Sequence, residues 1–180
     1  MNYEVNTWLE VFHIPSNIKN NVFILSIIAI LLVIIGGWYF INSSKAPDFQ
    51  LIDLNGKVFR LSDFRGKIVI LDFMATWCSP CKQQIPYLIE VWQKYENEIV
   101  IISISIDPIR DSEEILRDFI NRFPNATWIW ARDIADISIS YKVLAIPKIV
   151  IIDKDGNIAF EHLGTTHSSI IIQEIEKLRR

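Results

Sequence analysis

Residues 68–81 read IVILDFMATWCSPC, and this stretch decides the fold. Its first seven residues are almost all apolar and rich in β-branched side chains, which is typical of a strand covered on both faces of a sheet. After the second cysteine, apolar residues recur at three- and four-residue intervals and predict an amphipathic helix from Pro80 to Tyr95. The two cysteines therefore stand where a strand passes into a helix.

The position of the cysteines predicts their chemistry. Unsatisfied backbone N–H groups and the helix dipole favour negative charge at the start of a helix, so we expect Cys78 to ionise readily to a thiolate. Cys81 follows nearly one turn later on the same side, where it can close a small disulfide ring. We expect an exposed, activated thiol at Cys78 and a shielded thiol at Cys81.

A wider set of motifs resembles the thioredoxin superfamily, and more closely its membrane-anchored TlpA/ResA-like branch. The resemblance extends from about residue 46 to the C-terminus and rests on the order of these motifs: APDF at 46–49, NGK at 55–57, LSDF at 61–64, WCSPC at 77–81, IP at 146–147, DKDG at 153–156 and Gly164. A single C-x-x-C pair is equally compatible with half a zinc site, but the ordered set favours the redox family.

The resemblance implies an α/β protein with a thioredoxin fold, in which helices flank a mixed central sheet that is extended by an N-terminal β-hairpin. It also implies a thiol-disulfide oxidoreductase. Cys78 attacks a protein disulfide, and Cys81 then resolves the mixed disulfide. No dissociable cofactor and no metal are implied. The expected partners are protein disulfide or dithiol substrates and a membrane or soluble electron donor.

Asp72 interrupts the apolar strand six residues before Cys78. Burying an acid there without a purpose would be costly. Thioredoxins carry a buried acid at the matching position, which implies a raised pKa for Asp72 and a catalytic role in accepting the proton of Cys81. The competing interpretation is a strand-edge acid that faces solvent. Gln84 departs from the branch, which commonly has a glutamate at this position.

Three residues are candidates for substrate binding. The resemblance implies that Pro147 follows a cis peptide bond and faces the motif, and that Ile146 pairs its backbone with an extended substrate chain. From the residues alone, Pro147 is an ordinary proline at the start of a strand. We expect Trp77 to cover the disulfide and to offer an apolar surface to substrates, which is compatible with core packing.

Other functions fit parts of the pattern. A copper-binding chaperone on the same fold would use Cys78 and Cys81 with His162 or His167, although such proteins usually space their cysteines one residue wider. A peroxiredoxin-like peroxidase shares the fold and the hairpin but has a different sequence context around its cysteine. A non-catalytic binding module would tolerate the loss of both cysteines.

Residues 22–41 contain no charged side chain and are long enough to cross a bilayer as a helix. Trp38 and Tyr39 lie near the end of this run, as interfacial aromatic residues do. We expect a single-pass anchor in the cell membrane, in contact with lipid, rather than a buried core helix or a cleaved signal peptide. The flanking charges do not decide the orientation, and the resemblance implies an extracytoplasmic domain.

The expected organisation is a leader at residues 1–21, the transmembrane helix at 22–41, a linker at 42–46 and a thioredoxin-like domain at 47–180. A net charge of −3 provides no basic field for nucleic acid. Both cysteines of the chain belong to one motif, so their number does not reveal the redox compartment. We expect a monomer.

The rest of the chain alternates predicted strands and helices, as a sheet between helices requires. Asn55 and Gly56 are a strong hairpin signal, so we expect a β-hairpin between Phe49 and Phe59. Further strands are predicted at residues 99–106, 127–130, 148–152 and 158–162, and helices at 111–122, at 133–143 and after a cap at Thr166 or Ser168. We assign Trp128 and Trp130 to packing from one short strand.

Overall fold

The computed structural model describes residues 25, 27–32 and 45–180. The chain divides into two units between residues 42 and 43. In the first unit, residues 25 and 27–32 are helical, and the large apolar side chains among them are exposed. The remainder of the predicted anchor, the leader and most of the linker lie outside the described residues. Within the described residues, no helix has both the length and the apolar character needed to cross a membrane.

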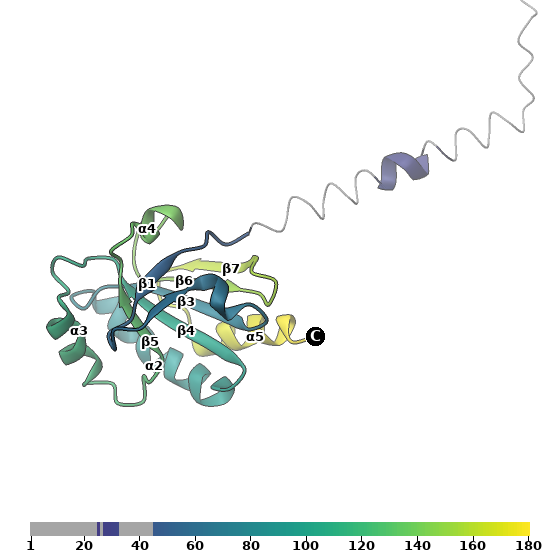
Figure 1. Cartoon of the computed structure of the whole chain (residues 1–180). Helices are drawn as coiled ribbons and strands as arrows, with labels where there is room; N and C mark the ends of the chain where they lie inside the picture. Colours follow the sequence, from purple (N-terminus) through teal and green to yellow (C-terminus); the bar gives the residue numbers. More distant parts are fainter. Residues whose placement is uncertain (1–24, 26, 33–44) are drawn as a thin grey trace, which may run out of the picture. The chain divides into compact units, whose positions relative to one another are not determined.

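The second unit consists of two sheets and the helices around them (Figure 1). The strands are β1 (Gln50–Ile52), β2 (Val58–Arg60), β3 (Ile68–Met74), β4 (Ile99–Ser105), β5 (Ile129–Arg132), β6 (Lys148–Ile152) and β7 (Ile158–Leu163). The helices are the 3₁₀ helix η1 (Leu61–Phe64), α2 (Ser79–Tyr95), α3 (Glu113–Ile120), α4 (Ile137–Ser140) and α5 (Ser168–Leu178).

The main sheet has five strands in the order β5-β4-β3-β6-β7. Strands β3, β4 and β5 are parallel, whereas β6 and β7 each run antiparallel to their neighbours. Every residue of β3 and β4 is buried, because these strands lie inside the sheet and are covered on both faces. The mixed sheet with flanking helices confirms the predicted thioredoxin-like architecture.

The two faces of the sheet have different covers (Figure 1). On one face, Ile70 and Met74 of β3 share a core with apolar residues of α2, α3 and α5. On the other face, Leu71 and Phe73 share a core with residues of the β1–β2 hairpin, η1 and α4. Because side chains alternate along a strand, Asp72 belongs to the face that α2 covers.

The N-terminal hairpin is confirmed, since β1 and β2 pair antiparallel from Gln50 opposite Arg60 to Ile52 opposite Val58. Gly56 adopts a φ of 81° in the turn, which glycine reaches without steric cost. The Asp53 carboxylate accepts the backbone N–H groups of Asn55 and Lys57, each at 2.8 Å. This side chain thereby satisfies the turn that the sequence predicts.

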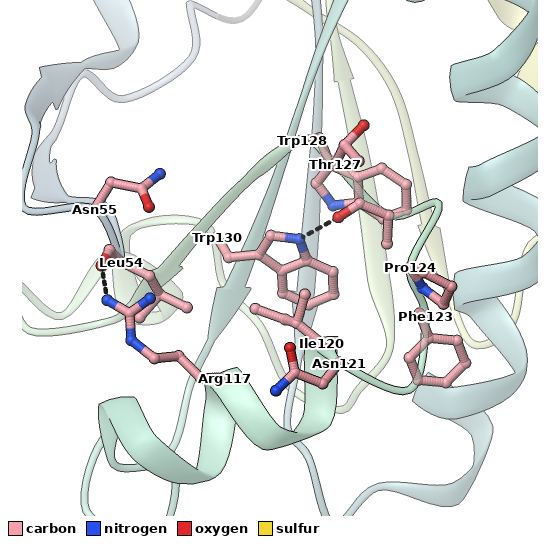
Figure 2. A pocket seen from close by; sticks show the side chains of 11 residues that line it. Leu54, Asn55, Arg117, Ile120, Asn121, Phe123, Pro124, Thr127, Trp128 and Trp130 are labelled. Carbon is pink, nitrogen blue, oxygen red and sulfur yellow. Dashed lines mark hydrogen bonds between the residues drawn. The ribbon is translucent and has the colours of Figure 1, made fainter.

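Strand β5 begins later than predicted. Its pairing with β4 starts at Ile129, so Trp128 precedes the strand and Trp130 lies within it. The two indole rings are nevertheless stacked, with centroids 5.6 Å apart (Figure 2). The prediction of one strand carrying both residues was therefore wrong in its boundary, because the strand follows the register of β4 and extends to Arg132 instead.

Two helix boundaries also differ from the predictions. Helix α4 is a single turn whose first N–H groups bond to Asp133, and Lys142 just beyond it has a φ of 50° that ends the helix. Helix α5 is capped by His167, whose Nδ1 accepts the Ser169 N–H at 3.2 Å. The two predicted caps make tertiary contacts instead: the Thr166 hydroxyl contacts His162, and the Ser168 hydroxyl bonds to Glu90.

Candidate active site

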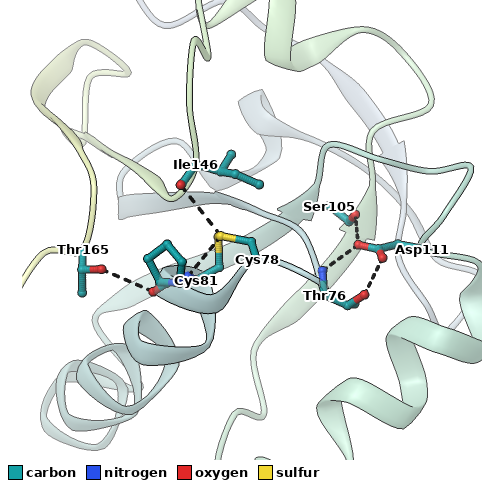
Figure 3. Close-up of a disulfide and its surroundings, with 8 residues drawn as sticks. Thr76, Cys78, Cys81, Ser105, Asp111, Ile146 and Thr165 are labelled. Carbon is teal, nitrogen blue, oxygen red and sulfur yellow. Dashed lines mark hydrogen bonds between the residues drawn. A yellow bond between two sulfur atoms is a disulfide. The ribbon is translucent and has the colours of Figure 1, made fainter.

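The two cysteines form a disulfide at the junction of β3 and α2 (Figure 3). Cys78 is the N-cap of α2, and its Sγ accepts the backbone N–H of Cys81 at 3.2 Å. Pro80 lies in the first turn, where the missing N–H has no helical partner to lose. The strand-to-helix junction thus places one sulfur beside the N–H groups that would stabilise it as a thiolate.

Cys78 is more shielded than the sequence suggests. Cys81 is fully buried as predicted, but Cys78 is only 5% exposed, so the expectation of an open thiol is wrong for this disulfide form. Its Sγ lies 3.8 Å from the carbonyl oxygen of Ile146, which belongs to the segment before β6. The segment before β6 therefore lies close to the Cys78 sulfur.

The Ile146–Pro147 peptide bond is cis, as the resemblance implies. Pro147 is buried and immediately precedes β6, while Ile146 is half-buried beside the motif. The Ile146 carbonyl points at the Cys78 sulfur (Figure 3). The structure therefore brings both residues to the disulfide, and substrate binding by them stays a prediction.

Trp77 lies on the surface next to the motif and is 51% exposed. Its indole N–H donates to Asp107 Oδ2 at 3.1 Å, and the Arg110 guanidinium lies 5.5 Å from its ring centroid. The loop after β4 therefore holds the ring in place through a hydrogen bond and a cation–π contact. Trp77 offers the expected apolar surface, and its exposure does not fit ordinary core packing.

Asp111 is a site residue that the sequence interpretation missed. It is fully buried and accepts the Thr76 N–H at 2.9 Å, the Thr76 hydroxyl at 2.5 Å and the Ser105 hydroxyl at 2.5 Å (Figure 3). The sequence placed Asp111 only at the start of a predicted helix, and the residue that caps this helix is Ser112. Because Thr76 stands two residues before Cys78, Asp111 anchors the loop that carries the cysteine to the end of β4.

Asp72 is fully buried, so the interpretation as a solvent-facing acid is wrong. Ser103 donates its hydroxyl to Asp72 Oδ2 at 2.8 Å, and Oδ1 has no hydrogen-bond partner within residues 45–180. Burial raises the pKa of Asp72 to about 7, and the Ser103 hydrogen bond opposes that rise. An acid on the α2 side of the sheet that ionises near neutral pH suits proton exchange with Cys81.

Gln84 is buried and pairs with the backbone of Thr166 before α5. Its Nε2 donates to the Thr166 carbonyl at 2.9 Å, and its Oε1 accepts the Thr166 N–H at 2.6 Å. Nearby, the Thr165 hydroxyl donates to the Pro80 carbonyl at 3.3 Å. An amide satisfies both backbone groups at once, so the departure from glutamate ties the first turns of α2 to the loop before α5.

Comparisons with known proteins agree with this geometry. The profile of the AhpC/TSA family matches residues 43–161. The chain belongs to the AhpC/TSA family. Among its relatives, the thiol-disulfide oxidoreductase ResA of Geobacillus thermodenitrificans is 34% identical over 138 residues, which cover 76% of this chain and 77% of ResA. The thioredoxin-like protein YneN of Bacillus subtilis is 30% identical over 135 residues, or 75% of this chain and 79% of YneN.

A solved structure shares the thioredoxin-like fold of this chain. The thioredoxin domain of a thiol-disulfide oxidoreductase from Bacteroides vulgatus superimposes with a TM-score of 0.64 at 28% identity, covering 74% of this chain and 94% of that domain. The present chain is a thiol-disulfide oxidoreductase of the thioredoxin fold, and Cys78 and Cys81 are its cysteine pair.

The histidines of the copper-chaperone alternative have other partners. His162 Nδ1 lies 3.0 Å from the Thr166 hydroxyl, and His167 Nδ1 caps α5. In the part of the chain that the structure describes, no three histidine, cysteine or acidic side chains are grouped as metal ligands would be. Neither histidine is thus assembled with the cysteines into a copper site.

A cavity of about 440 Å³ lies apart from the disulfide, between α3, the hairpin turn and the start of β5 (Figure 2). Trp128 and Trp130 line it, and Arg117 at its edge donates to the Leu54 carbonyl. Neither cysteine contributes to its wall. The cavity is therefore separate from the cysteine pair at the β3–α2 junction.

Proposed function

We propose that this protein is a membrane-anchored oxidoreductase that reduces disulfides of protein substrates outside the cytoplasm. One observation carries the proposal: the Cys78–Cys81 pair stands at the N-terminus of α2, with the Ile146 carbonyl facing the outer sulfur and a buried acid on the same side of the sheet. The cysteine pair, the carbonyl and the acid supply what the three steps need, which are attack on the substrate disulfide, alignment of the substrate and resolution of the mixed disulfide.

The reaction starts from the reduced dithiol. The Cys78 thiolate attacks one sulfur of the substrate disulfide, and the other substrate sulfur leaves as a thiolate that takes a proton from solvent. Asp72 then accepts the proton of Cys81, and the Cys81 thiolate attacks the Cys78 sulfur. The substrate's second sulfur leaves, and the Cys78–Cys81 disulfide forms. Two electrons pass from the protein to the substrate, and an electron donor restores the dithiol.

Substrate alignment falls to the residues around the Cys78 sulfur. An extended substrate segment would pair with the backbone at Ile146 in the manner of an added strand, and Pro147 keeps that segment beside the motif. Trp77 would contact apolar side chains next to the substrate cysteine. This arrangement accepts a polypeptide disulfide and makes no use of a dissociable cofactor.

The location rests on residues 22–41, which have the length and composition of a membrane-spanning helix. In the proposal this helix contacts lipid, the thioredoxin-like domain lies outside, and the protein acts as a monomer that receives electrons from a membrane or soluble donor. The chain has two cysteines, so labelling of a thiol reports on the motif alone.

Three measurements on the full chain test the proposed location and activity. In intact cells treated with a reductant, a membrane-impermeant maleimide should label the wild type and leave the Cys78→Ser/Cys81→Ser variant unlabelled. Labelling only after lysis would place the domain inside. For the purified chain, a midpoint potential near or below roughly −250 mV is expected of a reductant, and one near −120 mV would instead indicate an oxidant. Consumption of hydrogen peroxide by the reduced chain would favour the peroxidase alternative.

A further inference from the structure

Three buried side chains from different segments form a line of hydrogen bonds that ends at Asp72. The Trp128 indole N–H donates to Ser103 Oγ at 3.0 Å, and the Ser103 hydroxyl donates to Asp72 Oδ2 at 2.8 Å. Trp128 is 7% exposed, and the other two residues are fully buried. Ser103 lies directly opposite Asp72 in the β3–β4 register, so the backbone fixes their separation.

The direction of these hydrogen bonds follows from their chemistry. An indole N–H can only donate, so the Ser103 oxygen must be the acceptor from Trp128. The single Ser103 proton then points to Asp72 Oδ2. If Oδ2 itself carried a proton and donated it to Ser103, the Ser103 hydroxyl would lose its one hydrogen-bond acceptor within residues 45–180 and become a buried, unsatisfied donor.

The two oxygens of Asp72 are therefore not equivalent. In the neutral acid that keeps the hydrogen bond from Ser103 to Oδ2, the proton lies on Oδ1, where the O–H has no acceptor within residues 45–180 and is available for transfer. Within the described domain, Oδ1 is also the buried side-chain atom that lacks a hydrogen-bond partner. We propose that Ser103 and Trp128 are positioning residues that keep the Asp72 proton on Oδ1, from which it exchanges with Cys81 during resolution.

This proposal rests on the proposed role of Asp72 as proton acceptor. The other buried titratable side chains of α2 and its N-cap, of the loop after β4 and of β6 are Cys78, Cys81, Tyr95, Asp111 and Lys148. Lys148 is paired with Phe73, so it lies on the opposite face of the sheet from Asp72. Tyr95 bonds to Glu176, Asp111 to Thr76 and Ser105, and Lys148 to Glu161 and the Tyr141 carbonyl. Tyr95, Asp111 and Lys148 thus have hydrogen-bond partners of their own. Ser103 is the side chain that donates a hydrogen bond to Asp72.

The hydrogen-bonded line Trp128–Ser103–Asp72, here called the relay, affects the rate at which Cys81 resolves the mixed disulfide. A hydrogen bond donated to a carboxylate favours the ionised form, so Ser103 keeps Asp72 available as a base near neutral pH. Without that donor, Asp72 would hold its proton to higher pH and accept one from Cys81 less often at pH 7. The first attack by Cys78 does not use this proton and should be unaffected.

The test follows both steps in the full-length chain with a fluorescein-labelled peptide disulfide as the probe. Rapid mixing with excess peptide separates formation of the mixed disulfide from its resolution. Ser103→Ala should slow resolution at pH 7 about fivefold, raise the pH midpoint of that step by about one unit, and leave the first attack unchanged. The rate should recover at pH 9, and Ser103→Thr, which keeps the hydroxyl, should restore the wild-type profile.

Trp128→Phe provides the sharper comparison, since it keeps an aromatic ring and removes the donor to Ser103. Resolution should slow about threefold, with a smaller shift of the midpoint in the same direction. Trp130→Phe is the matched control, because its N–H donates to the Ala126 carbonyl outside the relay. Identical midpoints in the two phenylalanine variants, or equal slowing of both steps by Ser103→Ala, would overturn the proposal.

A second readout separates this proposal from the assignment of Asp72. The carboxylic-acid C=O band of Asp72, identified by its loss in Asp72→Asn, gives the ionisation midpoint in infrared spectra without turnover. If Asp72→Asn does not affect resolution, the proposed role of Asp72 fails. If Asp72→Asn slows resolution while the infrared midpoint is unchanged in both Ser103→Ala and Trp128→Phe, the relay alone fails.

Discussion

Asp72 and Asp111 are two fully buried acids that face serines two residues apart on β4. Asp111 accepts three hydrogen bonds that engage both of its oxygens, whereas Asp72 accepts one and leaves Oδ1 without a partner within residues 45–180. A carboxylate with satisfied oxygens holds its surroundings in place. A carboxylate with an unsatisfied oxygen is held less firmly in its charged form and is able to bind a proton. In the proposed mechanism, hydrogen-bond satisfaction therefore distinguishes the anchor, Asp111, from the proton carrier, Asp72.

The largest effect is expected from removing the anchor. Asp111→Ala leaves one N–H and two hydroxyl donors of Thr76 and Ser105 without their acceptor, so the free energy of unfolding should fall by about 3–5 kcal/mol. Urea unfolding of the oxidised chain measures this loss. Asp111→Asn, which keeps an acceptor oxygen, should lose less stability. An unchanged free energy of unfolding in Asp111→Ala would contradict the role of Asp111 as an anchor.

Removing Asp72, the proposed proton carrier, should instead raise the free energy of unfolding. The pKa of Asp72 rises from 3.8 to about 7 on folding, so Asp72 lowers the free energy of unfolding where its carboxyl group is ionised in the unfolded chain. This loss of stability is absent below pH 4, grows between pH 4 and 7, and is complete above pH 7. Asp72→Asn should therefore stabilise the oxidised chain by about 2–4 kcal/mol at pH 8 and by little at pH 4. Urea unfolding at both pH values checks this difference, and a pH-independent effect would contradict it.

Gln84 is a buried position at which a further acid can be introduced. In Gln84→Glu one carboxylate oxygen would replace the amide nitrogen that now donates to the Thr166 carbonyl. The two oxygens would repel each other unless the carboxylate were protonated. We expect a loss of about 1–3 kcal/mol at pH 8 that becomes smaller at pH 5. Thermal unfolding at the two pH values measures it, with Gln83→Glu on the exposed side of α2 as the matched control. A loss equal at both values would mean that the new acid stays ionised in this site.

The smallest effect is expected at Asp107, an acid on the surface loop beside Asp111. Asp107→Ala removes the partner of the Trp77 indole, but water can replace an exposed contact, so stability should change by less than about 1 kcal/mol. The KM for a protein disulfide should rise roughly threefold because the Trp77 ring is no longer fixed, and the rate with a small aromatic disulfide should not change. Equal changes for both substrates would argue against a docking role for Trp77.

Local patterns predicted much of the framework. The apolar runs of β3 and β4, the helical spacing after Cys81 and the turn at Asn55 and Gly56 all appear where expected. The errors lie at element boundaries, such as the start of β5 and the cap of α5. At those places side chains that the local pattern assigns to a strand or a cap are engaged by distant segments, as Ser168 is by Glu90.

The sequence alone predicted the fold class and the cysteine pair, because an ordered set of motifs carries them, and it favoured a buried position for the acid six residues before Cys78. The tertiary structure decided what surrounds each of them. Thr76 meets Asp111 across 35 positions, Trp128 reaches Ser103 across 25, and Gln84 pairs with Thr166 across 82. Hydrogen bonds of this kind depend on strand register and on how helices pack over a sheet, so whether a buried acid is an anchor or a proton carrier is decided only when the chain has folded.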